Sequence, residues 1–218
     1  MKSVLRIAHD KLQQKLNISA KAWQRNIITS ITILVLFLFS CSPKKTELPA
    51  LFEALNSKQT GIDFVNRLTP TPEFNMFKYM YFYNGAGVGV GDFNDDGQSD
   101  IFFSSNQGEN KLYLNEGGLK FNDVTKEAKI PQDGGWSTGV SVVDINNDGL
   151  LDIYVCRVCK YETLISKNQF LICKGKDANC IPFYVDEAGK MGLDFSGFST
   201  QAAFFDYDLD VDLDFFLM

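Results

Sequence analysis

Internal repetition is the sequence feature that most limits what this chain can fold into. Three nine-residue acidic segments align, and their first residues are 52 and 62 residues apart: Asp92–Asp100, Asp144–Asp152 and Asp206–Asp214. A chain that repeats itself at such intervals builds the same small unit several times instead of one irregular core. The repeat is therefore the frame in which each strand has to be placed.

Each repeat is predicted to contain short strands separated by turns. Small or β-branched residues precede every acidic segment, and an apolar run follows it, as at 101–103, 153–155 and 215–217. Residues 111–115 and 121–125 add two strands to the first repeat. Short strands at regular spacing indicate an all-β fold. A period of this length is typical of β-propeller blades of four strands each.

The acidic segments have the pattern of a calcium-binding loop. Positions 1, 3, 5 and 9 are Asp or Asn in all three, and position 6 is Gly in the first two. Calcium takes about 6–8 oxygen ligands, which these side chains, the position 7 carbonyl and water can supply. An EF-hand is excluded, because position 12 is Phe103, Val155 or Leu217 where that motif needs Glu.

A solvent-facing turn without an ion is the alternative, because Asp and Asn are common in turns. Three such loops in register favour calcium, since neighbouring carboxylates repel one another without a counter-ion. The third loop has Val211 in place of the turn Gly, and a β-branched residue resists a positive φ. Calcium is therefore predicted for the first two loops, and the third stays an open candidate.

The N-terminal segment has the features of an export signal. Basic and polar residues precede an apolar run of 14 residues, Ile27–Ser40, whereas a bilayer-spanning helix needs about 20. Residues 38–41 (Leu-Phe-Ser-Cys) resemble a bacterial lipobox. Residues 1–40 are therefore predicted to be a lipoprotein signal peptide and Cys41 the lipidated residue, with Ser42 favouring the outer membrane. An uncleaved anchor helix or a buried helix is the alternative.

Four further cysteines follow Cys41, and their even number in an exported chain predicts two disulfides in any of three pairings. A four-cysteine zinc site is the alternative, because the first two have ligand spacing, although the second pair lies too far apart. The four candidates are Cys156, Cys159, Cys173 and Cys180.

Composition excludes two classes of function. The net charge is −6, and residues 1–40 hold six of the 21 Lys and Arg but one of the 27 Asp and Glu, which leaves −11 on the rest. Nucleic-acid binding needs surplus Lys and Arg, so nucleic acid is not an expected partner. The single histidine is His9, so a chain cleaved before Cys41 has none for catalytic triads or metal ligation.

Several motifs besides the acidic loops complete a recognisable pattern: Gly61–Phe64, Tyr81–Gly87, Lys111–Asn115, Gly139–Asp144 and Ser196–Asp206. Together they resemble the FG-GAP/VCBS repeat β-propellers, the repeat also found in integrin α-subunits. Within these, the match is to the bacterial cartilage-acidic-protein-like, ASPIC/UnbV-associated group.

Residues 41–50 are predicted to be a tether, and the resemblance implies a propeller segment at 51–218 with about three repeats, the last truncated. Because propellers have about 4–8 blades, the chain is expected to form an incomplete propeller and to be an N-terminal fragment. The resemblance also implies calcium in the loops. Its ligands would be Asp92, Asn94, Asp96, Gln98 (carbonyl) and Asp100; Asp144, Asn146, Asp148, Leu150 (carbonyl) and Asp152; and Asp206, Asp208, Asp210 and Asp214.

Three functions compete on the sequence. The first is a non-enzymatic, lipid-anchored module that binds a surface protein or glycan. The second is a calcium-dependent polysaccharide hydrolase or lyase, which needs paired carboxylates, although calcium already explains the acidic positions and no catalytic residue stands out. The third is structural support for a further domain.

Two aromatic features complete the expectations. Trp136 is placed in the core between blades, an exposed tryptophan that stacks on a sugar being the alternative. The run Tyr79–Tyr83 is expected to pack as a strand rather than to form a ligand platform.

Overall fold

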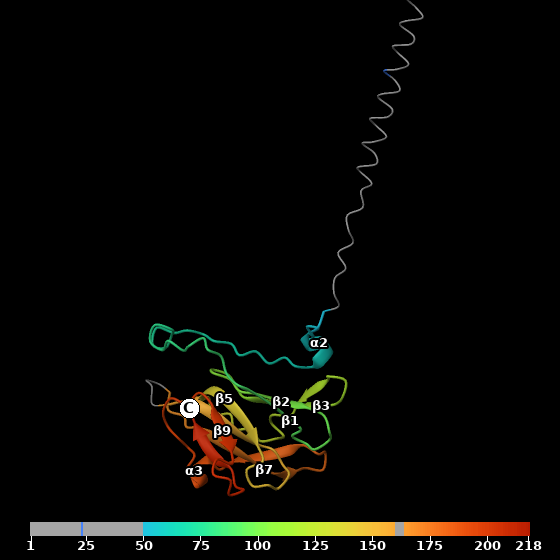
Figure 1. Ribbon diagram of the computed structural model, residues 1–218. Helices are drawn as coiled ribbons and strands as arrows, with labels where there is room; N and C mark the ends of the chain where they lie inside the picture. The colour runs from blue at the N-terminus through green and yellow to red at the C-terminus, as the bar shows by residue number, and fades with distance from the viewer. Residues whose placement is uncertain (1–22, 24–49, 160–163) are drawn as a thin grey trace, which may run out of the picture. The chain divides into compact units, whose positions relative to one another are not determined.

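The computed structural model describes residues 23, 50–159 and 164–218 (Figure 1). The chain divides into two compact units, Met1–Glu53 and Ala54–Met218, and every described strand belongs to the second. Cys41, most of the tether and all of the predicted signal peptide except Trp23 lie outside the described residues. Among the helices that are described, none has the length and apolar character needed to cross a membrane.

Two four-stranded antiparallel sheets form most of the second unit, and each follows chain order from its first strand to its fourth. The first sheet contains β1 (Val88–Gly91), β2 (Asp100–Phe103), β3 (Lys111–Asn115) and β4 (Phe121–Asp123). The second contains β5 (Trp136–Val143), β6 (Asp152–Val158), β7 (Gln169–Lys176) and β8 (Pro182–Asp186).

A two-stranded sheet follows, made of β9 (Ala202–Phe205) and β10 (Asp214–Leu217). In all three sheets an acidic segment joins the first strand to the second, as the sequence predicts. The all-β fold is therefore confirmed, and the described strands form blade-like sheets that do not close into a propeller. Two helices of four residues, α2 (Ser57–Thr60) and α3 (Ala188–Met191), complete the described elements.

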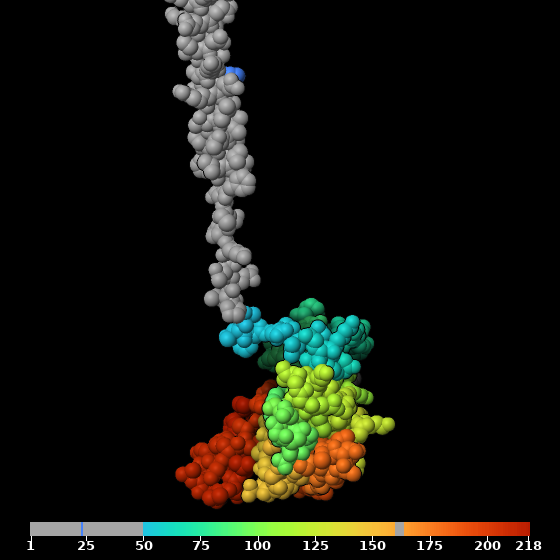
Figure 2. Space-filling model, turned by 90° about the vertical axis from the view of Figure 1, so that its right-hand side faces the viewer, coloured from blue at the N-terminus to red at the C-terminus, as the bar shows by residue number. Residues whose placement is uncertain are grey.

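Strand β6 shows how the sheets stack. All seven of its residues are buried, and alternate side chains enter different cores. Ile153 and Val155 join the cluster shared with the first sheet, whereas Tyr154 and Cys156 join the cluster shared with β9 and β10. A sheet covered on both faces needs an almost continuous apolar sequence, which explains the run after Asp152. In Figure 2 the red C-terminal residues lie beside the yellow and orange surface of the second sheet.

Glycines allow the first strands of successive sheets to approach closely. A Cβ atom on Gly89 would lie 2.7 Å from Val142 Cγ2, and one on Gly139 would lie 2.2 Å from the carbonyl oxygen of Thr200. A side chain at Gly89 would push β1 away from β5. A side chain at Gly139 would push β5 away from the segment that leads into β9. The glycines that precede the first two acidic loops therefore allow the close spacing of the sheets.

Aromatic residues close the end of the second sheet where β5 begins. Trp136 is 1% exposed and packs with Phe74, Tyr79 and Phe82, which confirms its predicted place in the core. The run Tyr79–Tyr83 contains no strand, and its residues 80–83 form turns. Its buried residues, Tyr79 and Phe82, are three positions apart, and a turn places such residues on one side. The expectation that this run packs as a strand is therefore wrong.

Candidate metal-binding loops

The three acidic loops follow one backbone path. Positions 4 and 6 have positive φ angles in every loop: Asp95 58° and Gly97 84°, Asn147 55° and Gly149 82°, Leu209 65° and Val211 81°. Val211 thus takes the conformation that its branched side chain was expected to resist. Its side chain is 92% exposed, so the cost lies in local backbone strain and not in packing.

The first carboxylate of each loop holds the turn together. Asp144 accepts the backbone N–H of Asp148 at 3.0 Å with Oδ1 and that of Gly149 at 2.9 Å with Oδ2. Asp92 and Asp206 make the same pair of bonds in their own loops. Because these bonds are local, three short sequences of equal spacing fold into equal loops.

The ninth residue of each loop accepts the backbone N–H of the second residue, and in the first two loops it is also bonded to the third strand of the sheet. Asp100 and Asp152 are fully buried. Asp100 accepts the N–H of Phe93 at 2.8 Å and that of Asn115, in the third strand, at 2.7 Å. Asp214 accepts the N–H of Tyr207 at 2.8 Å in the same way. Burial raises the pKa of Asp152 to about 6, against the lowering effect of its two N–H donors, and the charges of Asp148 and Asp144 raise it further.

The third loop brings three carboxylates together most closely. One oxygen each of Asp206, Asp208 and Asp210 lies within 4.8 Å of the others. No other group of three or more acidic, Cys or His residues with this spacing occurs in the described ranges. The charge of Asp210 is the largest cause that raises the pKa of the neighbouring Asp212, as expected where anions are crowded.

In the first two loops position 3 is an amide. Asn94 Nδ2 donates to Asp96 Oδ2 at 3.0 Å, and Asn146 Nδ2 donates to Asp148 Oδ2 at 2.9 Å. Asn94 Oδ1 is buried and has no hydrogen-bond partner. Rotating the Asn94 amide by half a turn would place its Oδ1 beside Asp96 Oδ2. The two oxygens would then lie together as ligands for a hard cation. The donor set of these loops, made entirely of oxygen, therefore fits calcium.

Two contacts between distant segments carry no sequence signal, and the first of them lies beside an acidic loop. Lys176, at the end of β7, donates from Nζ to the carbonyl oxygen of Asn94 at 2.8 Å and lies 3.6 Å from Asp95 Oδ2. Arg157 is 1% exposed, and its Nη1 lies 2.6 Å from Asp133 Oδ2. Both pairs join segments that are distant in the chain, so sequence spacing could not reveal them.

The predicted disulfides are not formed. Cys156, Cys159, Cys173 and Cys180 are free thiols, and the first three are buried. Cys156 and Cys173 belong to clusters on opposite faces of the second sheet, and Cys180 lies in an exposed turn after β7. The same separation excludes the four-cysteine zinc site. The even number of cysteines was misleading because strand alternation, and not count, decides which side chains meet.

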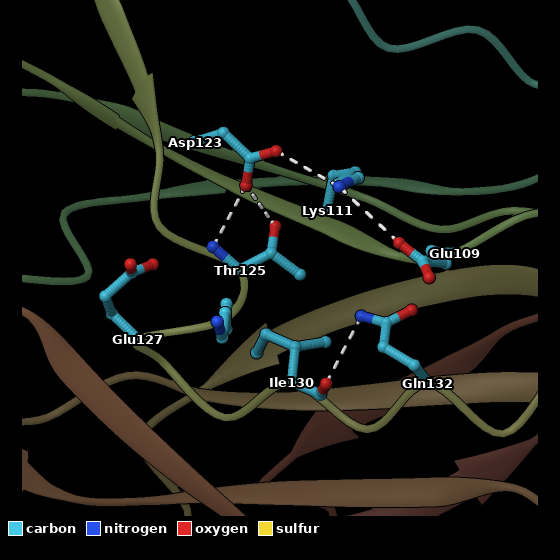
Figure 3. Close-up of a pocket in the computed structure, with 8 residues that line it drawn as sticks. Glu109, Lys111, Asp123, Thr125, Glu127, Ile130 and Gln132 are labelled. Carbon is cyan, nitrogen blue, oxygen red and sulfur yellow. Dashed lines mark hydrogen bonds and ion pairs between the residues drawn. The ribbon is translucent and has the colours of Figure 1, made fainter.

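A polar groove beside β3 and β4 offers a test of the enzymatic alternative (Figure 3). Its volume is about 540 Å³, and Lys111 Nζ lies 3.1 Å from Asp123 Oδ2 and 3.6 Å from Glu109 Oε2. Burial favours the neutral form of Asp123, but hydrogen bonds from Thr125 and Lys111 outweigh it and hold its pKa below the ordinary value. A glycosidase acid needs a raised pKa, so Asp123 does not supply one.

Comparison with known proteins agrees with this geometry. Residues 92–155, which include the first two acidic loops, match the model of the FG-GAP-like repeat family. Cartilage acidic protein 1 of Mus musculus is 36% identical over 69 residues, or 32% of this chain and 11% of the relative. The Xenopus tropicalis protein of the same name is 32% identical over 81 residues, or 37% and 12%. The matches span about a tenth of these relatives, and the segment from Asp92 to Val155 is thus similar to an FG-GAP-like repeat.

Proposed function

We propose that this chain is a non-enzymatic, calcium-stabilised binding module that presents its loops to a protein or glycan at the cell surface. The observation that carries the proposal is the threefold recurrence of one loop geometry with oxygen donors only. The similarity of residues 92–155 to an FG-GAP-like repeat supports the proposal, because propellers built from such repeats present loops to protein or glycan ligands.

In this proposal calcium is held by the side chains at positions 1, 3, 5 and 9 and the carbonyl at position 7 of each loop, Gln98 and Leu150 in the first two. The third loop is included, because Asp206, Asp208 and Asp210 already lie close together. Bound calcium would neutralise the repulsion within each loop and stiffen the connection between the first two strands of each sheet.

Thermal melting of the full chain in calcium, in magnesium and in excess chelator tests the metal. A ligand present at about 100 times its Kd stabilises the folded state by about 2.7 kcal/mol. We expect calcium to raise the melting temperature more than magnesium, because magnesium demands stricter octahedral geometry. Equal melting in all three conditions would contradict the proposal.

Two matched variants locate the effect. Asp144→Asn removes a loop carboxylate and should lose most of the increment from the second loop. Asp177→Asn alters a turn carboxylate that accepts the N–H groups of Asn179 at 2.8 Å and Ile181 at 3.0 Å but lies outside the loops. It should lower the melting temperature equally with and without calcium.

Anchoring at the outer membrane through Cys41 is a separate part of the proposal, supported by the apolar run 27–40 and the sequence Leu38–Cys41. Cys41→Ala should abolish incorporation of a labelled fatty acid and release the protein from the membrane fraction. Cys180→Ala keeps Cys41 and should leave both unchanged. Unaltered labelling of the Cys41 variant would refute the anchor.

A further inference from the structure

A second candidate site lies at the opposite end of the first strands from the acidic loops. This pocket, called here the aromatic pocket, has a volume of about 360 Å³ and is lined by Tyr79, Tyr81, Asn84, Gly85, Trp136, Thr138 and Thr200. Thr138 lies near the start of β5, and the second acidic loop begins directly after the last residue of β5. The six residues from Thr138 to Asp144, extended at about 3.3 Å each, separate the two sites by about 20 Å.

One wall of the aromatic pocket is a fixed group of rings. Tyr79 and Trp136 are buried and meet edge to face, with ring centroids 5.9 Å apart. Tyr81 packs edge to face on Tyr79 at 5.8 Å and keeps 52% of its surface exposed. The pocket therefore presents a tyrosine ring that packs on the buried Tyr79 and keeps about half of its surface open to a ligand.

The remaining lining is polar but uncharged. Neither the side-chain amide of Asn84 nor the hydroxyl of Tyr81 forms a hydrogen bond with any described residue. Thr138 Oγ1 donates to the carbonyl oxygen of Ser199 at 2.7 Å, which fixes it and leaves its lone pairs able to accept. Gly85 has a φ of 84°, and a Cβ atom there would have no heavy atom within 4 Å, so the backbone leaves space at the mouth.

The absence of charge from this lining limits the ligand. The lining residues of the aromatic pocket include no Lys, Arg, Asp or Glu, whereas the groove of Figure 3 is lined by Glu109, Lys111, Asp123, Lys126 and Glu127. An ionic ligand would find no counter-charge in the aromatic pocket. A ligand with one apolar face and several hydroxyl groups would satisfy the ring, the amide and the threonines together.

We propose that the aromatic pocket binds a neutral pyranose sugar, whose C–H face stacks on Tyr81 and whose hydroxyls bond Asn84 and Thr138. Small-molecule pockets have volumes of about 300–1,000 Å³, so this one suits a single ring or a short chain end. The inference rests on the proposed binding function and names the class of glycan. Because no residue of the aromatic pocket is a proposed calcium ligand, the sugar would not contact the metal in the loops.

Saturation-transfer NMR of the full chain with the methyl pyranosides of glucose, galactose and mannose tests the inference. We expect transfer from the protein to the ring C–H protons of at least one glycoside. Tyr81→Ala should weaken its binding at least about tenfold, and Tyr81→Phe should retain it within about threefold, because the ring supplies the stacking surface. Tyr83→Ala is the matched control, since Tyr83 is 60% exposed but does not line the pocket.

Melting of the same preparations with and without calcium separates this inference from the proposed function. Calcium-dependent melting together with no glycoside binding overturns the pyranose site and leaves the calcium module standing. Binding that survives Tyr81→Ala, in a variant with unchanged circular dichroism, also overturns it. Binding lost in Tyr81→Ala and kept in Tyr83→Ala supports it, whatever the melting experiment shows.

Discussion

The carboxylate of Asp152 joins an acidic loop to the third strand of its sheet, because its Oδ1 accepts the backbone N–H of Cys173 at 2.8 Å. Its Oδ2 accepts the N–H of Ile145 at 3.1 Å, within the loop. One buried side chain therefore satisfies two backbone donors that no strand partner reaches.

We expect Asp152→Asn to destabilise the fold by about 1–3 kcal/mol, the cost of leaving a buried donor unpaired, since an amide offers one oxygen where the carboxylate offers two. Urea unfolding in chelator measures this loss without a metal contribution. Asp148→Asn, at an exposed position of the same loop, should change the free energy of unfolding by less than about 0.5 kcal/mol. Equal losses for the two variants would contradict the role given to Asp152.

Val211→Gly should stabilise the protein. A non-glycine residue in the left-handed region costs about 1–2 kcal/mol, and Val211 has a φ of 81° with no packing to lose. The greater freedom of glycine in the unfolded chain offsets about 0.5–1 kcal/mol of this gain. The net increase in the free energy of unfolding should be about 0.5–1 kcal/mol by urea denaturation. Val90→Gly, at an exposed residue of β1, should lower it, and a loss in both variants would refute the strain.

The sequence was sufficient to predict the repeat, the all-β class and the position of the acidic loops between strands. These features depend on residues that are close in the chain, such as Asp144 and Gly149 within one turn. Trp136 was also placed correctly, because a large aromatic residue beside a strand start has few places outside a core. That the loops hold metal stays a prediction.

Features that depend on which strand faces which could not be predicted. Lys176 contacts the loop residue Asn94 across 82 positions of the chain, and Arg157 is buried against Asp133. The aromatic run was assigned to a strand because a short apolar stretch has no period that separates strand from turn. At Val211 the expectation that a β-branched residue resists a positive φ failed, although it rested on local sequence. The hydrogen bonds of neighbouring loop residues determine the backbone there.

Gly139→Ala should separate the second sheet from β9. Its Cβ would lie 2.2 Å from the Thr200 carbonyl oxygen and 2.3 Å from Gln201 Oε1, and the backbone oxygen cannot rotate away. Overpacking of this kind costs about 1–3 kcal/mol. Gly189→Ala is the control, because the nearest atom to its Cβ is 3.8 Å away and alanine favours a helix by about 1 kcal/mol. If both variants melted alike, close approach would not be the reason for Gly139.

The ion pair of Asp133 with Arg157 should give a measurable pH dependence. Burial opposes ionisation of Asp133, but the hydrogen bond and charge of Arg157 outweigh it and hold the pKa below its ordinary value. A depressed folded-state pKa stabilises the fold fully above the unfolded value of about 3.9 and loses this as pH falls through the folded value. The stability difference between the natural chain and Asp133→Asn should be constant from about pH 5 to 7 and shrink below about pH 4. A difference that persists unchanged to pH 2 would show that charge is not its source.

The four thiols of the described residues should differ sharply in reactivity. Burial raises the pKa of Cys156 to about 12 and also raises those of Cys159 and Cys173, so these thiols stay protonated and shielded. Cys180 is exposed, and reactivity follows the exposed thiolate. Without reductant, a thiol reagent should modify Cys180 rapidly and the other three only after urea is added, while Cys180→Ser should remove the rapid phase alone. If urea released no additional thiols, the cysteines would be paired and the second sheet would have to differ from the one described.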